Sequence, residues 1–194
     1  SHASEPENGK NPVTVMANIL KKTEKYFLPG INPERIKLIT PIFCKLGERA
    51  FGTNPGYAEM MFTIRASRRN DFEHLKNYLI KTIQEYIDKV TPPGSLYMEY
   101  EWVEEFPNTV NDPGCNKIVL ESAKQFKLPL EIMPFPFRWS EDFGHFLEKY
   151  PGAIFGVGAG TRQAALHNPD YDFPDDLLET GIKMFYSIYN NILS

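Results

Sequence analysis

Two segments in the N-terminal half repeat apolar residues every three or four positions, which is the period of a helix with one buried face. The first follows Asn11 and Pro12, where asparagine is a good N-cap and proline fits the first helical position, and it extends to about Tyr26. The second begins at Asn70, and its apolar positions are Phe72, Leu75, Leu79, Ile80, Ile83, Ile87 and Val90. The pattern therefore predicts two amphipathic helices.

Three further segments have the composition and alternation of strands. They cover residues 35–46, residues 57–66 and, after the second helix, residues 96–103. The order α-β-β-α-β lacks only the leading strand of the βαββαβ unit that defines ferredoxin-like domains. We therefore predict a ferredoxin-like domain over residues 1–103, with two helices on one face of an antiparallel sheet and a first strand that precedes Ser1.

Helices and strands alternate in the second half of the chain. We expect helices over residues 113–126, 141–150 and 174–193, and strands over residues 130–135 and 153–159. Such alternation is typical of an open parallel α/β sheet, although two strands cannot build one alone. The fold class is therefore α/β (α+β), with residues 104–194 forming part of a larger domain.

Composition limits the classes of function. The 194 residues are 42% hydrophobic and 24% charged, which is typical of a globular protein. The net charge of −4 argues against nucleic acid as a partner, since binding phosphates needs a basic surface. No window approaches the roughly 18 apolar residues of a membrane span. The spacing of the two cysteines, Cys44 and Cys115, is not that of a metal site, so we expect two free thiols. We expect Cys44 to lie in an apolar setting. Free thiols favour a reducing compartment, and we therefore expect a cytoplasmic location.

The residues that could carry chemistry are few. His167 lies in a loop after a glycine-rich segment, with Asp170 and Asp172 nearby, and spacing alone leaves a metal-ligand role and a surface role open. Glu141 follows Ser140, and both fit the start of a helix without any function, as an acidic first turn and an N-cap. The glycine-rich segment itself matches no phosphate-binding motif.

Four stretches, in this order, resemble the zinc-dependent amidohydrolase and carboxypeptidase family. Its members include N-acyl-amino-acid deacetylases, hippurate hydrolases, auxin-conjugate hydrolases and carboxypeptidase G. The stretches are Ser1-His2-Ala3-Ser4 through Pro12, Phe62-Thr63-Ile64-Arg65, Ser140-Glu141-Asp142-Phe143 with Pro151-Gly152-Ala153, and Leu166-His167-Asn168-Pro169 with Asp172-Phe173. The resemblance is strongest to the branch that acts on N-acyl or aminobenzoyl amino-acid conjugates.

The resemblance implies an enzyme that cleaves an amide bond with water activated by two metal ions, zinc or manganese. It implies that residues 1–103 are a lid and dimerisation domain, and that residues 104–194 are the C-terminal piece of the catalytic domain. Most metal ligands and the general base would then lie outside these 194 residues, so we expect the chain alone to be inactive and the intact protein to be a homodimer. The alternative is a dimerisation or lid module with no catalysis.

The resemblance also implies roles for single residues. His167 matches the family's final metal ligand, and His2 matches a histidine that donates a hydrogen bond to the substrate carbonyl in the neighbouring subunit. Arg65 matches an arginine that approaches the substrate carboxylate. Asn54, Glu141 and Gly158 are further substrate-binding candidates. Arg138-Trp139 stands where many relatives have Met-Gly, which implies a different acyl or side-chain preference.

Overall fold

A computed structural model describes residues 1–28, 32–90, 92–139 and 141–193. The fold is a mixed α/β arrangement that divides into two compact units. The first unit contains Ser1–Asn108 and Phe135–Ser140, and the second contains Thr109–Pro134 and Glu141–Ser194. Within the described residues, no helix is long and apolar enough to cross a membrane.

The sheet of the first unit is a hairpin of β1 (Lys37–Leu46) and β2 (Ala58–Ala66). The strands are antiparallel, as predicted, and pair from Lys37 opposite Ala66 to Leu46 opposite Ala58. The register shifts between Pro41 and Phe43, because Pro41 pairs with Phe62 and Phe43 pairs with Met61. Proline has no N–H to donate to the ladder, so a bulge at this position is expected.

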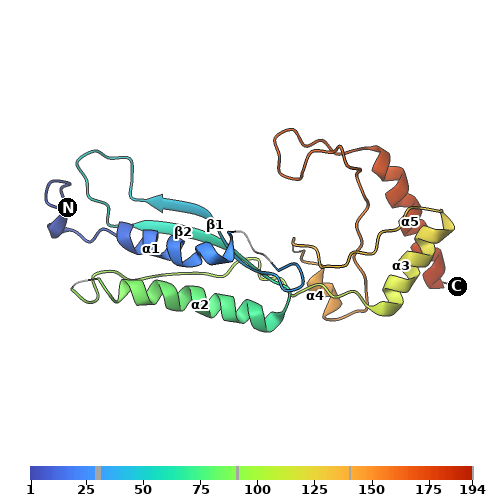
Figure 1. Cartoon of the computed structure of the whole chain (residues 1–194), viewed down its shortest axis with the longest axis horizontal. Coiled ribbons are helices and arrows are strands. Elements are labelled where there is room, and N and C mark those ends of the chain that lie inside the picture. The colour runs from blue at the N-terminus through green and yellow to red at the C-terminus, as the bar shows by residue number, and fades with distance from the viewer. Residues whose placement is uncertain (29–31, 91, 140, 194) are drawn as a thin grey trace. The chain divides into compact units, whose positions relative to one another are not determined.

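Both predicted helices of the first unit are confirmed. They are α1 (Val13–Thr23), which continues into the short 3₁₀ turn η2 (Glu24–Tyr26), and α2 (Arg69–Ile87). They cover one face of the hairpin (Figure 1). Their apolar faces build the core, which consists of Val15, Ile19, Ile39, Leu75, Leu79 and Ile87 with Met60, Phe62 and Ile64 packed against it. The apolar residues that repeat every three or four positions in the helices therefore pack against those that alternate along β2, in one core.

The prediction of a third strand over residues 96–103 is wrong. The sheet of the described residues has two strands, and residues 96–103 pair with neither. Leu96 and Met98 still pack against the core. A strand exists only where a second backbone accepts and donates its ladder hydrogen bonds, and in a βαββαβ unit the last strand takes that partner from the first. The four-stranded ferredoxin-like sheet is therefore not formed by the described residues.

Two helices form the core of the second unit, α3 (Pro113–Gln125) and α5 (Asp176–Leu193). Val119, Ala123 and Met184 are buried between them. Asp112 caps α3, since its Oδ1 accepts from the Cys115 N–H at 2.9 Å. Polar side chains also join the two helices, where Asn191 Nδ2 donates to Ser122 Oγ at 2.9 Å. Both predicted helices are thereby confirmed.

The other predictions for the second unit need correction. The strands predicted over residues 130–135 and 153–159 are absent, and the predicted helix over residues 141–150 shortens to α4 (Gly144–Leu147). The expected N-cap, Ser140, lies outside the described residues. The Asn111 side chain satisfies the backbone of Ile154, accepting from its N–H at 2.9 Å and donating to its carbonyl at 2.8 Å. The backbone of Ile154, which was predicted to pair with a neighbouring strand, is thus hydrogen-bonded by a side chain.

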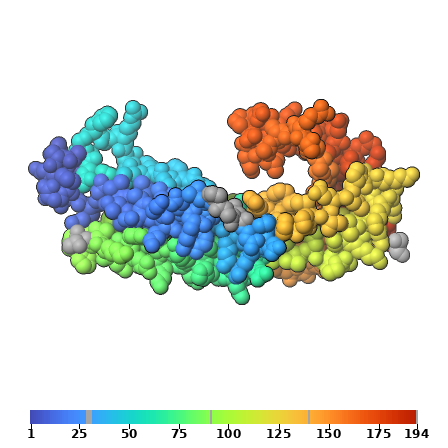
Figure 2. Space-filling view, viewed as in Figure 1, coloured from blue at the N-terminus to red at the C-terminus, as the bar shows by residue number. Residues whose placement is uncertain are grey.

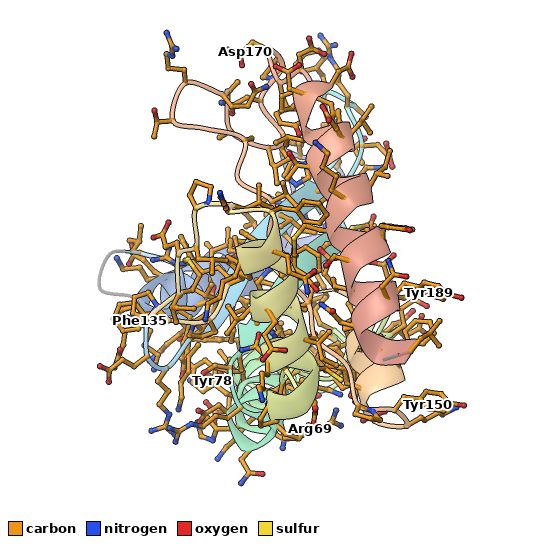
Figure 3. All side chains as sticks on the ribbon, turned by 90° about the vertical axis from the view of Figure 1, so that its right-hand side faces the viewer. Arg69, Tyr78, Phe135, Tyr150, Asp170 and Tyr189 are labelled. Carbon is orange, nitrogen blue, oxygen red and sulfur yellow. The ribbon has the colours of Figure 1, made fainter. Side chains whose placement is uncertain are left out.

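Much of α5 is apolar and exposed. Its exposed hydrophobic residues are Leu178, Ile182, Phe185, Tyr186, Tyr189, Ile192 and Leu193. Figure 3 shows Tyr189 projecting outward from this helix. Surface patches of this kind are typical of an interface with another segment or chain.

Candidate active site

His2 lies at the end of the first unit where the loop between β1 and β2 is located. Its backbone forms an isolated antiparallel bridge with Thr53. The Ala3 N–H donates to the Gly52 carbonyl at 2.8 Å, and the Asn54 N–H donates to the Ser1 carbonyl at 2.9 Å. In Figure 2 the dark blue N-terminal residues lie against this blue-green loop. The His2 side chain is exposed there, so its backbone is fixed while its ring remains accessible.

Asn54 is the buried centre of the same contact, with 8% of its surface exposed. Its Oδ1 accepts from Asn11 Nδ2 at 2.8 Å, and its Nδ2 donates to Ser1 Oγ at 3.1 Å and to the Pro6 carbonyl at 3.4 Å. Asn11 Oδ1 in turn accepts from the Val13 N–H at 2.9 Å, at the first residue of α1, whereas the N-cap position predicted for Asn11 is occupied by Pro12. Asn54 therefore holds the N-terminal segment that carries His2, and its amide is already occupied inside the protein.

Arg65 lies at the opposite end of the hairpin from His2. It pairs with Leu38, whereas the loop contacted by His2 begins beyond Leu46 and Ala58. At about 3.3 Å per residue, the strand from Ala58 to Arg65 covers roughly 23 Å. That separation exceeds the length of an N-acyl amino acid. His2 and Arg65 of one chain therefore cannot both contact one such molecule.

Arg65 is bordered by the segment that returns to the first unit. Its Nη1 donates to the Arg138 carbonyl at 3.4 Å. The neighbouring rings of Phe137 and Trp139 are stacked, with centroids 4.2 Å apart and planes 14° apart. Trp139 remains 52% exposed. The arginine and the stacked rings therefore place a cation and an aromatic surface in the same part of the unit.

The other three candidates belong to the second unit. Glu141 is exposed and precedes α4. A side chain at Gly158 would meet nothing within 4 Å, so packing does not require a glycine there. His167 is exposed and adopts a φ of 69°, in the left-handed region that residues other than glycine rarely adopt. Glu104 and Lys127 adopt the same region, each with a φ of 53°, so the conformation alone does not mark His167 as functional.

No three histidine, cysteine, aspartate or glutamate side chains of the described part of the chain lie close enough together to bind a metal ion. His167, the predicted ligand, has an exposed side chain, and imidazole nitrogen is a suitable donor for zinc. The two cysteines are free thiols. Cys44 is exposed on β1, against the expectation of an apolar setting. Burial raises the pKa of the Cys115 thiol, which disfavours the thiolate that would bind a metal.

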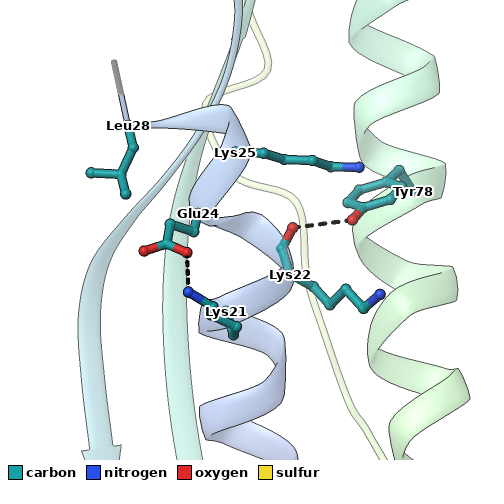
Figure 4. A pocket seen from close by; sticks show the side chains of 6 residues that line it. All are labelled: Lys21, Lys22, Glu24, Lys25, Leu28 and Tyr78. Atoms are coloured by element: carbon teal, nitrogen blue, oxygen red, sulfur yellow. Dashed lines mark hydrogen bonds and ion pairs between the residues drawn. The ribbon is translucent and has the colours of Figure 1, made fainter. Parts of the chain in front are cut away.

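An open hollow of about 520 Å³ lies at the end of α1, and none of the candidate residues lines it (Figure 4). It is lined by Lys21, Lys22, Glu24, Lys25, Leu28 and Tyr78. Lys21 forms an ion pair with Glu24 at 2.6 Å, and Lys25 Nζ lies 4.6 Å from the centre of the Tyr78 ring. Two of its three lysines are therefore already engaged within the protein.

The residues that sequence reasoning missed are those that hold His2. Ser4 contacts the His2 ring, Asn11 contacts Asn54, and Gly52 adopts a φ of 82° beside the His2 ring. The spacing of His2 and Ser4 is a signal for a local turn. The contact between Asn11 and Asn54 joins residues 43 positions apart, and no sequence pattern signals it.

The family model for peptidase family M20/M25/M40 matches residues 2–191. The chain belongs to this family. The resemblance inferred from the four short stretches is thereby confirmed. A thermostable carboxypeptidase of Saccharolobus solfataricus is 24% identical over 189 residues, which cover 93% of this chain and 45% of that protein. An N-acetyldiaminopimelate deacetylase of Lactobacillus acidophilus is 23% identical over 187 residues, which cover 93% of this chain and 46% of that protein.

A solved structure of the M20 family shares the fold. The Bacillus subtilis YXEP protein, described as a dinuclear metal-binding peptidase, superimposes with a TM-score of 0.65 at 18% sequence identity. The match covers 93% of this M20 chain and 46% of the B. subtilis chain. The chain thus spans about half the length of the curated relatives it matches.

Proposed function

We propose that this M20 chain supplies part of the active site of a hydrolase that cleaves the amide bond of N-acyl or aminobenzoyl amino-acid conjugates. The observation that carries the proposal is the backbone bridge that fixes His2 to Thr53. It is found in a chain whose residues 2–191 match the family. The backbone of His2 is fixed on the loop after β1, and its ring is exposed at the end of the unit. A histidine held in this way is suited to contact a substrate outside its own unit.

His167 has the role of a metal ligand in this proposal. Its imidazole is exposed and therefore accessible to a metal ion. Zinc and manganese both accept imidazole nitrogen, and the remaining ligands would come from residues outside the described set. A bound metal pair would supply a water of lowered pKa for attack on the amide carbonyl.

His2 acts as a hydrogen-bond donor to the substrate. When water adds to an amide, negative charge develops on the carbonyl oxygen, and a donor already aimed at that oxygen stabilises the transition state more than the ground state. Arg65 binds the carboxylate of the amino-acid part, since a guanidinium matches a carboxylate with two parallel hydrogen bonds. Glu141 and the backbone at Gly158 are the substrate-binding candidates of the second unit.

The hairpin geometry supports a homodimer. His2 and Arg65 are separated by roughly 23 Å of strand, so one small substrate contacts both only if the two residues come from different chains. We therefore place His2 in the partner chain's active site. The 194 residues alone have no catalytic activity in this scheme, because a catalytic zinc site takes about three protein ligands.

The test uses the full-length protein that contains this chain. With zinc or manganese added, it is expected to hydrolyse N-acetyl, N-benzoyl or aminobenzoyl amino acids, whereas the isolated 194 residues are not. His167→Ala is expected to lose one metal ion and most of the activity, and the exposed His74→Ala is the matched control. Unchanged metal content in His167→Ala would remove His167 from the ligand set. A dimeric full-length protein that hydrolyses none of these amides would favour the non-catalytic lid module.

A further inference from the structure

Ser4 contacts one nitrogen of the His2 ring with both its backbone and its side chain. The Ser4 N–H donates to His2 Nδ1 at 3.1 Å, and Ser4 Oγ lies 2.6 Å from the same nitrogen. The Glu5 N–H closes this turn by donating to the His2 carbonyl at 3.0 Å. Two contacts from one residue therefore converge on Nδ1.

These contacts determine which ring nitrogen carries the proton. A backbone N–H can only donate, so Nδ1 must be the acceptor and carries no hydrogen. The Ser4 hydroxyl, which can rotate, then donates to Nδ1 as well. A neutral imidazole without a proton at Nδ1 carries it at Nε2. His2 therefore presents an Nε2–H donor.

The His2 ring lies beside the loop between β1 and β2. The His2 backbone is bridged to Thr53, and a Cβ at Gly52 would lie 3.9 Å from His2 Nε2. Gly52 has a φ of 82°, which a side chain would disfavour. The ring thus lies beside Gly52, with Nδ1 occupied by Ser4.

We propose that Ser4 is a positioning residue that holds His2 in the Nε2–H tautomer. The tautomer itself follows from the contacts of Ser4. Its use in the reaction, as a hydrogen bond from Nε2 to the substrate carbonyl, rests on the proposed function. With the opposite tautomer, Nε2 would present a lone pair to the developing oxyanion and would repel it. Ser4 thereby decides whether His2 can assist the reaction.

The tautomer can be read in the 194-residue chain by long-range ¹H–¹⁵N correlation of the histidine rings at alkaline pH, with His2→Ala to assign the signals. The wild-type chain is expected to show the Nε2–H form alone for His2. Ser4→Ala keeps the backbone N–H at 3.1 Å and loses the closer hydroxyl, so it is expected to retain the Nε2–H form as the larger part of a mixture of the two tautomers. Ser4→Thr, which keeps the hydroxyl, should show the single form. A mixture already in the wild type, or an unchanged pattern in Ser4→Ala, would overturn the proposal.

Kinetics of the full-length protein separate this proposal from the proposed function. Ser4→Ala is expected to lower kcat several-fold with KM nearly unchanged, less than the roughly 10²–10³-fold loss expected for His2→Ala. A changed tautomer with unchanged kcat in both variants would support Ser4 as the positioning residue and overturn the role of His2. A low kcat in His2→Ala together with an unchanged tautomer in Ser4→Ala would overturn the role of Ser4 alone.

Discussion

Arg35 and Asp71 form a two-point contact that joins the start of β1 to the first turn of α2. The Arg35 guanidinium donates from Nε to Asp71 Oδ2 and from Nη2 to Asp71 Oδ1, both at 2.7 Å. Lys37 Nζ lies 2.8 Å from the same carboxylate, which is nearly buried. A carboxylate in the first turn also interacts favourably with the positive end of the helix dipole. The contact therefore fixes how α2 packs on the hairpin.

The stability of the first unit should depend on pH through Asp71. Hydrogen bonds from Arg35 and then Lys37 hold the pKa of this carboxyl well below its ordinary value of about 3.9. A lowered pKa in the folded state adds stability that is complete above the ordinary value and is lost as pH falls toward the folded-state pKa. We expect the free energy of unfolding to fall below about pH 4.

Asp71→Asn should remove that pH dependence and cost about 1–2 kcal/mol at neutral pH, because Arg35 is half exposed and partly screened by water. The exposed Glu34→Gln is the control. Urea unfolding followed at several pH values measures both variants. An Asp71→Asn protein with wild-type stability at neutral pH would contradict the assigned role of this contact.

Two glycines of the second unit should respond differently to alanine. A Cβ at Gly152 would lie 2.8 Å from Leu147 Cδ2 and 3.4 Å from Phe143 Cζ, so the ends of these side chains must shift, and we expect Gly152→Ala to cost about 1 kcal/mol through overpacking. A Cβ at Gly158 meets nothing within 4 Å, and Gly158→Ala should change stability by less than about 0.5 kcal/mol. If the Gly158 backbone contacts substrate, Gly158→Ala should nevertheless lower kcat/KM of the full-length protein. Thermal unfolding and kinetics of the pair test this, and the reverse order of stabilities would refute it.

Asn54 should matter for stability because its amide is buried and bonded. Asn54→Ala leaves the Asn11 amide and Ser1 hydroxyl without their partner, which is expected to cost roughly 1–3 kcal/mol. The exposed Asn8→Ala, which loses only a contact to Glu5, is the matched control. Hydrogen exchange of the Ala3 N–H should accelerate in Asn54→Ala and stay unchanged in Asn8→Ala. Equal protection in both variants would show that Asn54 does not hold the N-terminal segment.

The sequence predicted the elements whose signals are local. The helix periods and the alternation of β2 each depend on neighbours within a few positions, and both agree with the structure. The start of α1 differs by one residue, because Pro12 and not Asn11 is its N-cap. The strands predicted over residues 96–103, 130–135 and 153–159 depend on a distant backbone as partner, which composition cannot reveal. Element type was thus predictable where the stabilising contacts are close in sequence.

For the candidate site too, local signals were predictable from the sequence and contacts between distant residues were not. The family motifs pointed to His2 and His167, and the spacing of Ser4 two residues after His2 signals a turn. The burial of Asn54 was not predictable, because it comes from contacts to Ser1, Pro6 and Asn11 across more than 40 positions. From the sequence, Asn54 was a substrate-binding candidate. In the structure its side chain holds the N-terminal segment that carries His2.

The most direct test of the account mixes two inactive variants of the full-length protein, His2→Ala and His167→Ala. A mixed dimer would contain one site with an intact metal ligand from one chain and an intact His2 donor from the other. The account predicts that activity returns to about one quarter of the wild-type level after equal mixing and re-association, since half of the dimers are mixed and each has one good site. Mixed dimers that form, as shown by differently tagged chains purifying together, and remain inactive would contradict the placement of His2 in the partner's active site.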